Sequence, residues 1–326
     1  MKKLIIPAFL AVVALANAEE LKLSNYILNT SFSGDARVKY EMDSYDGTTS
    51  DSDFFTTRLR LNTTTKINDN FSFGSRLRFQ KEPIGNDTDG TVSLQRLYMD
   101  YKTGNHSIRV GRMGSPLYLL NDILIDTNVE GFAYSTKFNN TQLKAGFLLR
   151  NAKTTTETSD ENSIIYAQGV QTIKIGENKL VVEASAYSED NKETSPKSQA
   201  EKAFTLGAEY TQNLTGPIQM AQVKGQYIMT DADDDNSGYS AGLVIGSKEI
   251  KEKGSWQGIA EYKSLEKNGF IYVNSDTKLD QKIAKIGAIA YVAPNTNLEV
   301  TYEMYDYVPS SKDDKNVLST TLNYTF

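Results

Sequence analysis

The sequence predicts an all-β fold, a transmembrane antiparallel β-barrel of about sixteen strands. Three observations lead to this prediction: an export signal at the N-terminus, alternation of apolar and polar residues along most of the chain, and connections that alternate between short and long. Alternation alone would also fit a soluble sandwich or propeller. All three together are typical of a chain that crosses a membrane with strands.

The first eighteen residues have the organisation of a secretory signal peptide. Lys2 and Lys3 precede an apolar run from Leu4 to Leu15, and the small residues of Ala16-Asn17-Ala18 follow it. The apolar run is too short for a membrane-spanning helix, which needs about 20 residues. We therefore expect cleavage after Ala18, with residues 19–326 forming one exported barrel domain.

Alternation of apolar and polar residues recurs in segments of about ten residues, which is the strand length of membrane barrels. It is strict over residues 71–79 and returns at 58–63, 143–150, 180–186, 204–210 and 298–304. A period of two places successive side chains on opposite faces of a sheet. A barrel in lipid satisfies its backbone internally, turns apolar side chains outward and turns polar side chains towards water.

The connections between these segments alternate in length. Short polar turns are predicted near 68–70, 103–105, 139–140, 176–178, 215–217, 253–254 and 294–295, and longer polar loops at 42–53, 81–91, 112–127, 151–162, 188–202, 230–238, 264–281 and 308–316. Outer-membrane barrels combine short periplasmic turns, longer outer loops and an even strand number. This indicates sixteen strands with both termini on the periplasmic side. The count stays open near 264–281, because residues 270–273 could pair within that loop.

The C-terminal segment 318–326 alternates back from the terminal Phe326, with Tyr324 two residues before it. This pattern resembles the signature by which barrel proteins are recognised for insertion into the outer membrane. The resemblance implies that the last strand binds the barrel-assembly machinery through Tyr324 and Phe326. An ordinary edge strand is the alternative interpretation.

Residues 96–147 resemble the Gram-negative general porins. The motifs are Arg-Leu-Tyr-Met-Asp-Tyr at 96–101, Ile-Arg-Val-Gly-Arg at 108–112, and Gly-Ser-Pro at 114–116, which opens a connection ending at 126–131. The resemblance implies that the third outer loop, 112–127, folds into the barrel lumen and narrows the pore. It also implies a homotrimer located in the cell outer membrane, in contact with lipid and lipopolysaccharide.

Arginine is confined to one part of the chain. Eight of the nine Arg lie between positions 37 and 112, and seven of these eight alternate with the apolar residues of their strands: Arg37, Arg58, Arg60, Arg76, Arg78, Arg96 and Arg109. Arg is permanently charged and rigidly forked, whereas Lys is a mobile point charge. We interpret the seven as a fixed cationic wall of the lumen, the alternative being Arg that are merely solvated there.

Acidic residues of the third loop are predicted to face this wall. Asp122 and Asp126 lie within the loop, and Glu130 follows it. Opposite charges across a narrow water channel create a transverse field that orders water and orients dipolar solutes. The apolar residues 117–120 are expected to pack the loop against the inner wall, with a subunit contact as the alternative.

No catalytic, cofactor or metal site is predicted. The chain has no Cys and a single His, His106, which lies beside a predicted periplasmic turn. Residues 231–238 resemble a calcium loop but lack its Gly at the sixth and Glu at the twelfth position. The net charge of −6 argues against nucleic-acid binding. An enzyme is therefore not expected.

These observations favour a porin that forms a water-filled channel for passive diffusion of ions and small polar solutes. A substrate-specific channel for an anion or a sugar is the first alternative, and a structural or adhesive barrel is the second. A sugar channel would be expected to show a row of aromatic side chains, and the third loop contains no clear one.

Overall fold

The computed structural model describes residues 29–47, 50–81, 90–118, 120, 128–151, 161–190, 201–269, 280–307 and 314–326. It contains sixteen strands: β1 (Thr30–Asp46), β2 (Ser52–Lys66), β3 (Phe71–Lys81), β4 (Thr91–Thr103), β5 (His106–Met113), β6 (Val129–Phe138), β7 (Thr141–Asn151), β8 (Glu161–Ile175), β9 (Asn178–Asp190), β10 (Lys202–Asn213), β11 (Met220–Thr230), β12 (Ser237–Gly246), β13 (Trp256–Leu265), β14 (Gln281–Ala293), β15 (Thr296–Tyr307) and β16 (Asp314–Thr325). Within these ranges, no helix has the length and apolarity that crossing a bilayer requires. The predicted signal peptide, residues 1–18, lies outside the described residues.

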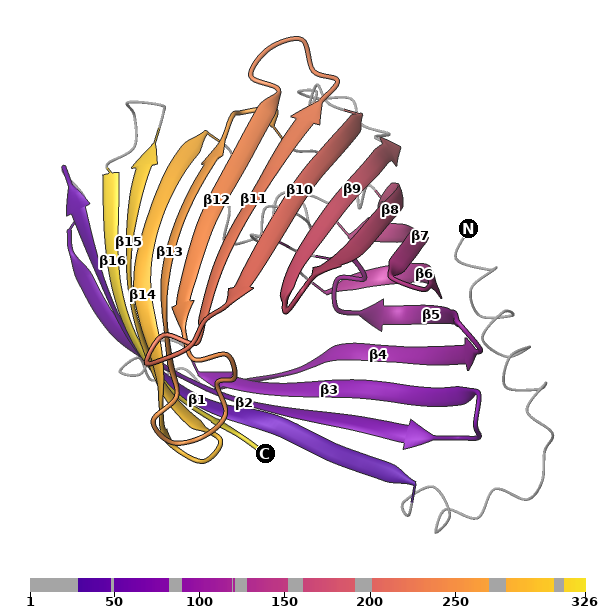
Figure 1. Cartoon of the computed structure of the whole chain (residues 1–326), viewed down its shortest axis with the longest axis horizontal. Helices are drawn as coiled ribbons and strands as arrows, with labels where there is room; N and C mark the ends of the chain where they lie inside the picture. The colour runs from indigo at the N-terminus through magenta and orange to yellow at the C-terminus, as the bar shows by residue number, and fades with distance from the viewer. Residues whose placement is uncertain are drawn as a thin grey trace.

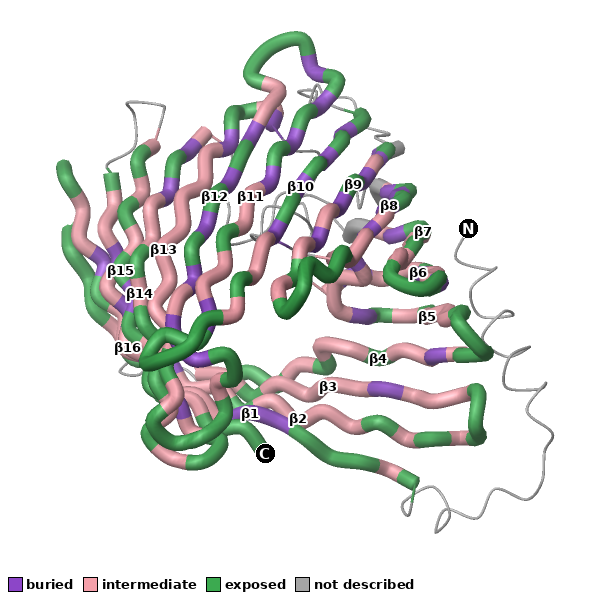
Figure 2. Tube along the Cα trace, viewed as in Figure 1, coloured by how far each residue is buried: buried purple, intermediate pink, exposed green. Residues whose placement is uncertain are grey.

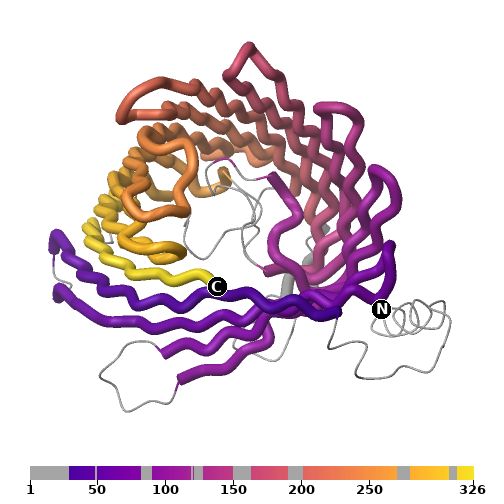
Figure 3. Tube along the Cα trace, turned by 60° about the horizontal axis from the view of Figure 1, so that its bottom comes forward, coloured from indigo at the N-terminus to yellow at the C-terminus, as the bar shows by residue number. Residues whose placement is uncertain are grey.

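Every strand pairs with its neighbours in sequence, and β16 pairs with β1, so the sheet closes into an antiparallel barrel (Figure 1). Figure 3 shows the strands arranged as a ring. The predicted fold class and the count of sixteen are confirmed. Residues 270–273, where the count was open, lie outside the described residues.

All seven predicted turns fall between strands, and six of these connections have two to six residues. The connection between β12 and β13, residues 247–255, is longer than the predicted turn near 253–254. Gly104, Asn139, Gly176 and Asn295 each adopt a positive φ in such a turn, a conformation that Gly and Asn tolerate better than other residues. The first outer loop is shorter than its predicted range of 42–53, because β1 and β2 remain paired up to Asp43 and Ser52. The lumen-facing positions at the outer end of β1 are polar, so polarity alone cannot separate the end of such a strand from a loop.

The two faces of the barrel differ in the sense expected for a membrane protein. Buried positions alternate with more exposed ones along β12 and along the first eight residues of β10 (Figure 2). Large apolar side chains such as Val38, Leu59, Phe79 and Leu322 are 39–47% exposed. Register pairs of this face, Val38 with Leu322 and Leu59 with Phe79, align apolar residues around the outside. The opposite face carries the charged residues and lines the lumen.

A β-bulge in β4 changes which face its residues occupy. Arg76 pairs with Arg96 and Leu77 pairs with Leu94, so Gln95 is an extra residue between two paired positions. Because of this insertion, Leu94 faces outward while Arg96, also at an even position, faces the lumen. If Gln95 were instead paired in a regular strand, Leu94 and Arg96 would face the same side, and Arg96 would point into lipid with Leu94.

One part of the inner wall is apolar. Buried side chains gather on the lumen side of β5–β13: Met113, Val129, Ala133, Leu148, Ile164, Tyr166, Tyr187, Ala203, Ile228 and Leu265. Leu117, from the connection between β5 and β6, belongs to the same cluster and is only 7% exposed. Leu117 therefore shields part of the apolar patch from water and is itself buried by it.

The same connection is held by hydrogen bonds to the wall. The backbone N–H of Tyr118 donates to Oε1 of Gln168 on β8 at 2.7 Å, and Nε2 of Gln168 donates back to the Tyr118 carbonyl at 3.1 Å. Leu120 is buried against β10, since a Cβ on Gly207 would lie 2.3 Å from its Cδ1. Burial raises the pKa of the Tyr118 hydroxyl to about 12. These contacts agree with the packing expected for 117–120, and residues 119 and 121–127 lie outside the described residues.

A buried polar network holds Gln168 in place. Glu183 of β9 is fully buried and accepts hydrogen bonds from Ser185 Oγ at 2.8 Å and from Gln226 Nε2 at 2.6 Å. Gln168 Nε2 also donates to Ser185 Oγ at 3.0 Å. A buried carboxylate is tolerated only where donors replace its lost hydration. The network therefore fixes the amide that binds Tyr118.

Candidate functional site

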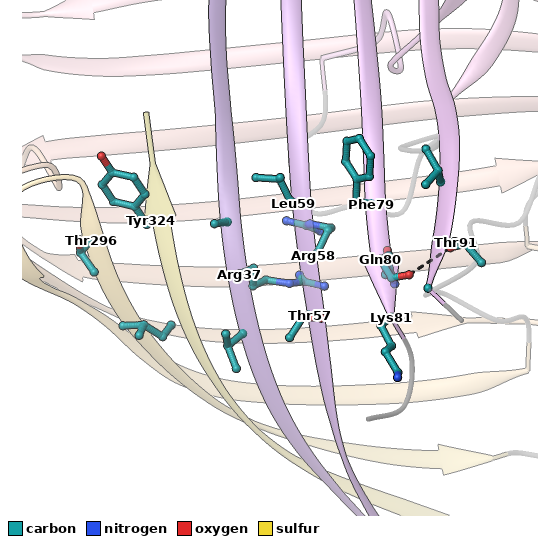
Figure 4. Close-up of a pocket in the computed structure, with 15 residues that line it drawn as sticks. Arg37, Thr57, Arg58, Leu59, Phe79, Gln80, Lys81, Thr91, Thr296 and Tyr324 are labelled. Carbon is teal, nitrogen blue, oxygen red and sulfur yellow. Dashed lines mark hydrogen bonds between the residues drawn. The ribbon is translucent and has the colours of Figure 1, made fainter. Parts of the chain in front are cut away.

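The lumen face of β1–β4 contains three cross-strand pairs of arginines. Arg37 lies opposite Arg58, Arg60 opposite Arg78, and Arg76 opposite Arg96. Figure 4 shows the side chains of Arg37 and Arg58 next to each other on neighbouring strands. Like charges directly opposite each other destabilise a sheet. The three successive pairs therefore need compensation from acids, from water or from solutes.

Asp35 of β1 supplies part of this compensation. Its Oδ1 accepts from Arg58 Nη2 at 2.8 Å, and its Oδ2 accepts from Arg60 Nε at 2.6 Å. The Asp35 side chain is only 11% exposed. One carboxylate thus bridges two cations and holds both guanidinium groups against the wall.

Arg109 is neutralised in a second ion pair. Its Nε and Nη2 bind the two oxygens of Asp100 at 2.6 and 2.8 Å, which is a bidentate arrangement. The guanidinium also lies over the ring of Tyr98, 4.2 Å from its centroid. These contacts fix Arg109 and cancel its charge locally.

Neutral amides orient the three arginines of β3 and β4, which are Arg76, Arg78 and Arg96. Arg76 Nε donates to Asn62 Oδ1 at 2.6 Å, and Arg96 Nε donates to Asn128 Oδ1 at 2.8 Å. The Gln95 amide, turned to accept, lies 3.3 Å from Nε and Nη1 of Arg78. Within the described ranges no carboxylate is at ion-pair distance from these three groups. The amides hold the arginines without reducing their charge.

From β11 through β16 to β1, several lumen cations pair with acids: Lys224 with Glu261, Lys285 with Glu303, Lys315 with Asp43, and Lys39 with Glu41. On β3 and β4, by contrast, Arg76, Arg78 and Arg96 have amide partners. Among the lumen arginines, these three therefore keep their charge without compensation from an acid at ion-pair distance within the described residues.

All seven predicted wall arginines face the lumen, whereas Glu130 does not. The register places Glu130 opposite Arg112 and Leu149, on the outer face of the barrel, and Arg112 Nη1 binds its Oε1 at 3.1 Å. Side chains alternate along β6, and Phe132 two residues later also faces outward. The prediction that Glu130 joins the constriction is wrong for this reason. Asp122 and Asp126 lie outside the described residues.

The sequence interpretation missed Asp35 and Asp100, the two acids of the arginine wall. The alternation of side chains along a strand could have located both acids. Asp35 lies two residues before Arg37, and Asp100 lies four residues after Arg96, so each faces the same side as its arginine. It also missed Gln168 and Glu183, for which no local signal exists because their role depends on contacts between distant segments.

The C-terminal strand completes the barrel at β1. The backbone of Phe326 exchanges two hydrogen bonds with Gly34, at 2.8 and 3.1 Å, and its ring occupies the space that a Cβ on Gly34 would need. Tyr324 and Phe326 lie on the outer surface, 47% and 45% exposed, with ring centroids 6.1 Å apart.

His106, the single histidine, lies at the β4–β5 turn, where its Nδ1 is 2.7 Å from the Tyr134 hydroxyl. Among the described residues no group of three or more potential metal ligands gathers.

Comparison with known proteins agrees with this architecture. The chain is similar in fold to Pseudomonas putida OprB, with 10% identity, a TM-score of 0.65, and coverage of 91% of this chain and 94% of that one. A triple mutant of the Rhodopseudomonas blastica porin gives 12% identity, a TM-score of 0.59, and coverage of 91% and 100%. At such identities the likeness shows the fold alone. No curated protein matches the sequence significantly.

A sequence model of the Gram-negative porin matches residues 5–326, almost the whole chain. The match agrees with the structure, which is a closed sixteen-strand barrel with an apolar outer face and a charged lumen. The chain therefore belongs to the Gram-negative porin family and forms a channel in the bacterial outer membrane.

Proposed function

We propose that the channel passes ions and small polar solutes by passive diffusion, and that a charged constriction selects among them. The observation that carries this proposal is the arginine wall of β1–β4, where three guanidinium groups have amide partners instead of acids. Arg37, Arg58, Arg60 and Arg109 belong to the same side of the constriction, where Asp35 and Asp100 compensate part of their charge.

The acidic side of the constriction is assigned to Asp122 and Asp126. The connection that carries them begins against the inner wall, because Leu117 is buried there and Tyr118 is bound by Gln168. We infer that the rest of this third outer loop continues into the lumen and faces the arginines. The resulting field orients dipolar solutes. An apolar solute passes less readily, because it has to displace the ordered water.

Replacement of the two acids tests this assignment. Two charges about 4 Å apart interact by about 1 kcal/mol in bulk water and by several times more where the effective dielectric is lower. Asp122→Asn with Asp126→Asn should therefore shift the reversal potential in a salt gradient towards anion preference. Arg58→Gln with Arg76→Gln should shift it towards cations.

The outer loop 231–236 offers a competing source of cation attraction. Neutralising Asp233, Asp234 and Asp235 in the same bilayer assay separates a field at the mouth from one at the constriction. A shift produced by these three residues, together with no shift from Asp122 and Asp126, would show that the constriction is misplaced.

A substrate-specific channel for anions is the second candidate, because Arg76, Arg78 and Arg96 keep their charge. Conductance that saturates with phosphate but rises linearly with chloride would favour it over general diffusion.

We further propose a homotrimer that contacts lipid and lipopolysaccharide, exported with residues 1–18 as a signal peptide and without enzymatic activity. Light scattering of the detergent-solubilised protein tests the trimer through its mass, and N-terminal sequencing of the mature protein tests cleavage after Ala18. Binding of the barrel-assembly machinery through Phe326 predicts that Phe326→Ala lowers the amount of assembled protein in the outer membrane. Phe138→Ala, at another exposed aromatic of the periplasmic end, is the control.

A further inference from the structure

Three tyrosines lie near Lys315 inside the outer end of the barrel, where its first and last strands join. Tyr45 of β1 and Tyr305 of β15 both lie opposite Lys315 of β16 in the register, and Tyr307 follows two residues after Tyr305 on the same face. All three alternate with outward-facing residues such as Met304, so they point into the lumen. Tyr45 and Tyr305 are 260 positions apart along the sequence, and only closure of the barrel brings them together.

The rings form an aromatic strip around one ammonium group. Tyr305 and Tyr307 are nearly parallel, with an interplanar angle of 18° and ring centroids 6.5 Å apart. Lys315 Nζ lies 5.7 Å from the Tyr45 centroid and 6.0 Å from the Tyr305 centroid. All three tyrosines are half-buried, so part of each remains accessible from the lumen.

The charges beside the strip are paired. Lys315 Nζ binds Asp43 Oδ2 at 2.7 Å, and the Tyr45 hydroxyl donates to the same oxygen at 3.5 Å. The Tyr305 hydroxyl donates to Glu303, which in turn binds Lys285. The strip therefore has little net charge, in contrast to the arginine wall.

Hydrogen-bonding capacity remains unused at the same place. Gln281 lies opposite Tyr307 in the register and is only 2% exposed, yet neither its Nε2 nor its Oε1 has a partner among the described residues. Asp43 Oδ1 is likewise buried and without a partner within the described part of the chain. Buried polar atoms in this state are rare, because each loses its hydration and gains no hydrogen bond in return.

This combination fits a neutral polyhydroxylated ligand. The apolar face of a sugar ring packs on an aromatic ring. Its hydroxyls both donate and accept hydrogen bonds, so they can serve the donor and acceptor of the Gln281 amide and the acceptor oxygen of Asp43. A free anion would meet Asp43, a free cation would meet Lys315, and an aromatic hydrocarbon would leave the polar groups unsatisfied. We propose that Tyr45, Tyr305 and Tyr307 form a binding site for short oligosaccharides at the outer mouth of the channel.

The site rests on the proposed channel function and precedes the constriction on the way inward. Tyr45 and Arg37 lie on the same face of β1, eight residues apart, which is about 26 Å along a strand. The described inward contacts of the third-loop connection are to β8 and β10, on a different part of the wall. A saccharide bound at the strip is therefore held in the path of ions without touching the arginines.

Current block by maltotriose tests this site. The full-length protein is inserted in a planar bilayer in KCl, and maltotriose is added on the side of the outer loops. We expect a current reduction that saturates with concentration. Tyr305→Ala with Tyr307→Ala should raise the half-saturating concentration by about fivefold or more, because both aromatic faces on which the sugar packs are removed. Tyr45→Ala on β1 provides an independent variant should the double variant not fold.

Matched variants separate recognition from general damage. Tyr302→Ala removes a tyrosine of the same strand that faces outward, and it should leave the half-saturating concentration unchanged. Tyr305→Phe with Tyr307→Phe keeps the rings and should retain most of the block. Normal KCl conductance without saturable block, or an equal loss in Tyr302→Ala, overturns this inference alone. Loss of KCl conductance in the unmodified protein would overturn the proposed function as well.

Discussion

Arg76 of β3 and Arg96 of β4 lie directly opposite each other in the register, and each binds an amide oxygen instead of a carboxylate. Two guanidinium groups in such a position repel each other, so the pair is unfavourable for the sheet itself. Because both side chains face the lumen, their positive charge acts on passing ions, and it does so more strongly than the charge of an arginine paired with an acid. Substitutions in this wall, and at the positions that contact Tyr118 and Leu120, change selectivity or the position of the loop in ways that can be measured.

Arg76→Gln with Arg96→Gln should lower anion preference more than any other pair of substitutions on the wall, because no acid cancels these charges among the described residues. The reversal potential in a KCl gradient measures the change. Arg112→Gln is the control, since Arg112 faces outward and pairs with Glu130. The difference should shrink at about 1 M salt, where the screening length is near 3 Å. A salt-independent effect would point to altered pore shape.

Asp35→Asn should change anion preference in the opposite direction. It leaves Arg58 and Arg60 without their shared carboxylate, so anion preference should rise in the reversal-potential assay. Thermal unfolding followed by circular dichroism in detergent should show a loss of stability of roughly 1–3 kcal/mol, because two charged hydrogen bonds disappear. Unchanged selectivity would mean that Asp35 has only a structural role.

Gln168→Leu should release the Tyr118 backbone from the wall. We expect larger fluctuations of the open-channel current and faster proteolysis within 114–127, with the barrel strands intact. Gln171→Leu is the matched control, because Gln171 lies three residues away on the outer face of β8. Equal current noise in both variants would contradict the assigned role of Gln168.

Gly207→Val should displace Leu120, because the new Cβ would lie 2.3 Å from Leu120 Cδ1. Overpacking of this kind costs about 1–3 kcal/mol and should move the connection away from β10. Limited proteolysis and single-channel conductance measure the displacement. Gly225→Ala on β11 is the control, since the nearest atom to its Cβ would be 3.6 Å away. No difference between the two variants would argue against the packing of Leu120 on β10.

The barrel could be predicted from the sequence because lipid and water impose a period of two on every strand. That rule assigned all seven arginines to the lumen, and applied to Phe132 it would also have excluded Glu130. It could not pair Asp35 with both Arg58 and Arg60, since cross-strand register depends on strand ends that polar lumen residues conceal. It could not place Tyr45 and Tyr305 on the two sides of Lys315 either, because that arrangement exists only after the barrel closes.

The extra residue Gln95 marks the position where β4 can change length without exchanging its two faces. Deletion of Gln95 itself would make Leu94 and Arg96 consecutive, so Leu94 would still face outward and Arg96 would still face the lumen. Deletion of one residue elsewhere in β4, with the bulge retained, would turn the side chains on one side of the gap to the opposite face. Relatives of this channel can therefore gain or lose the bulge residue and keep the pore charge, whereas at other positions of the strand pore chemistry diverges by substitution.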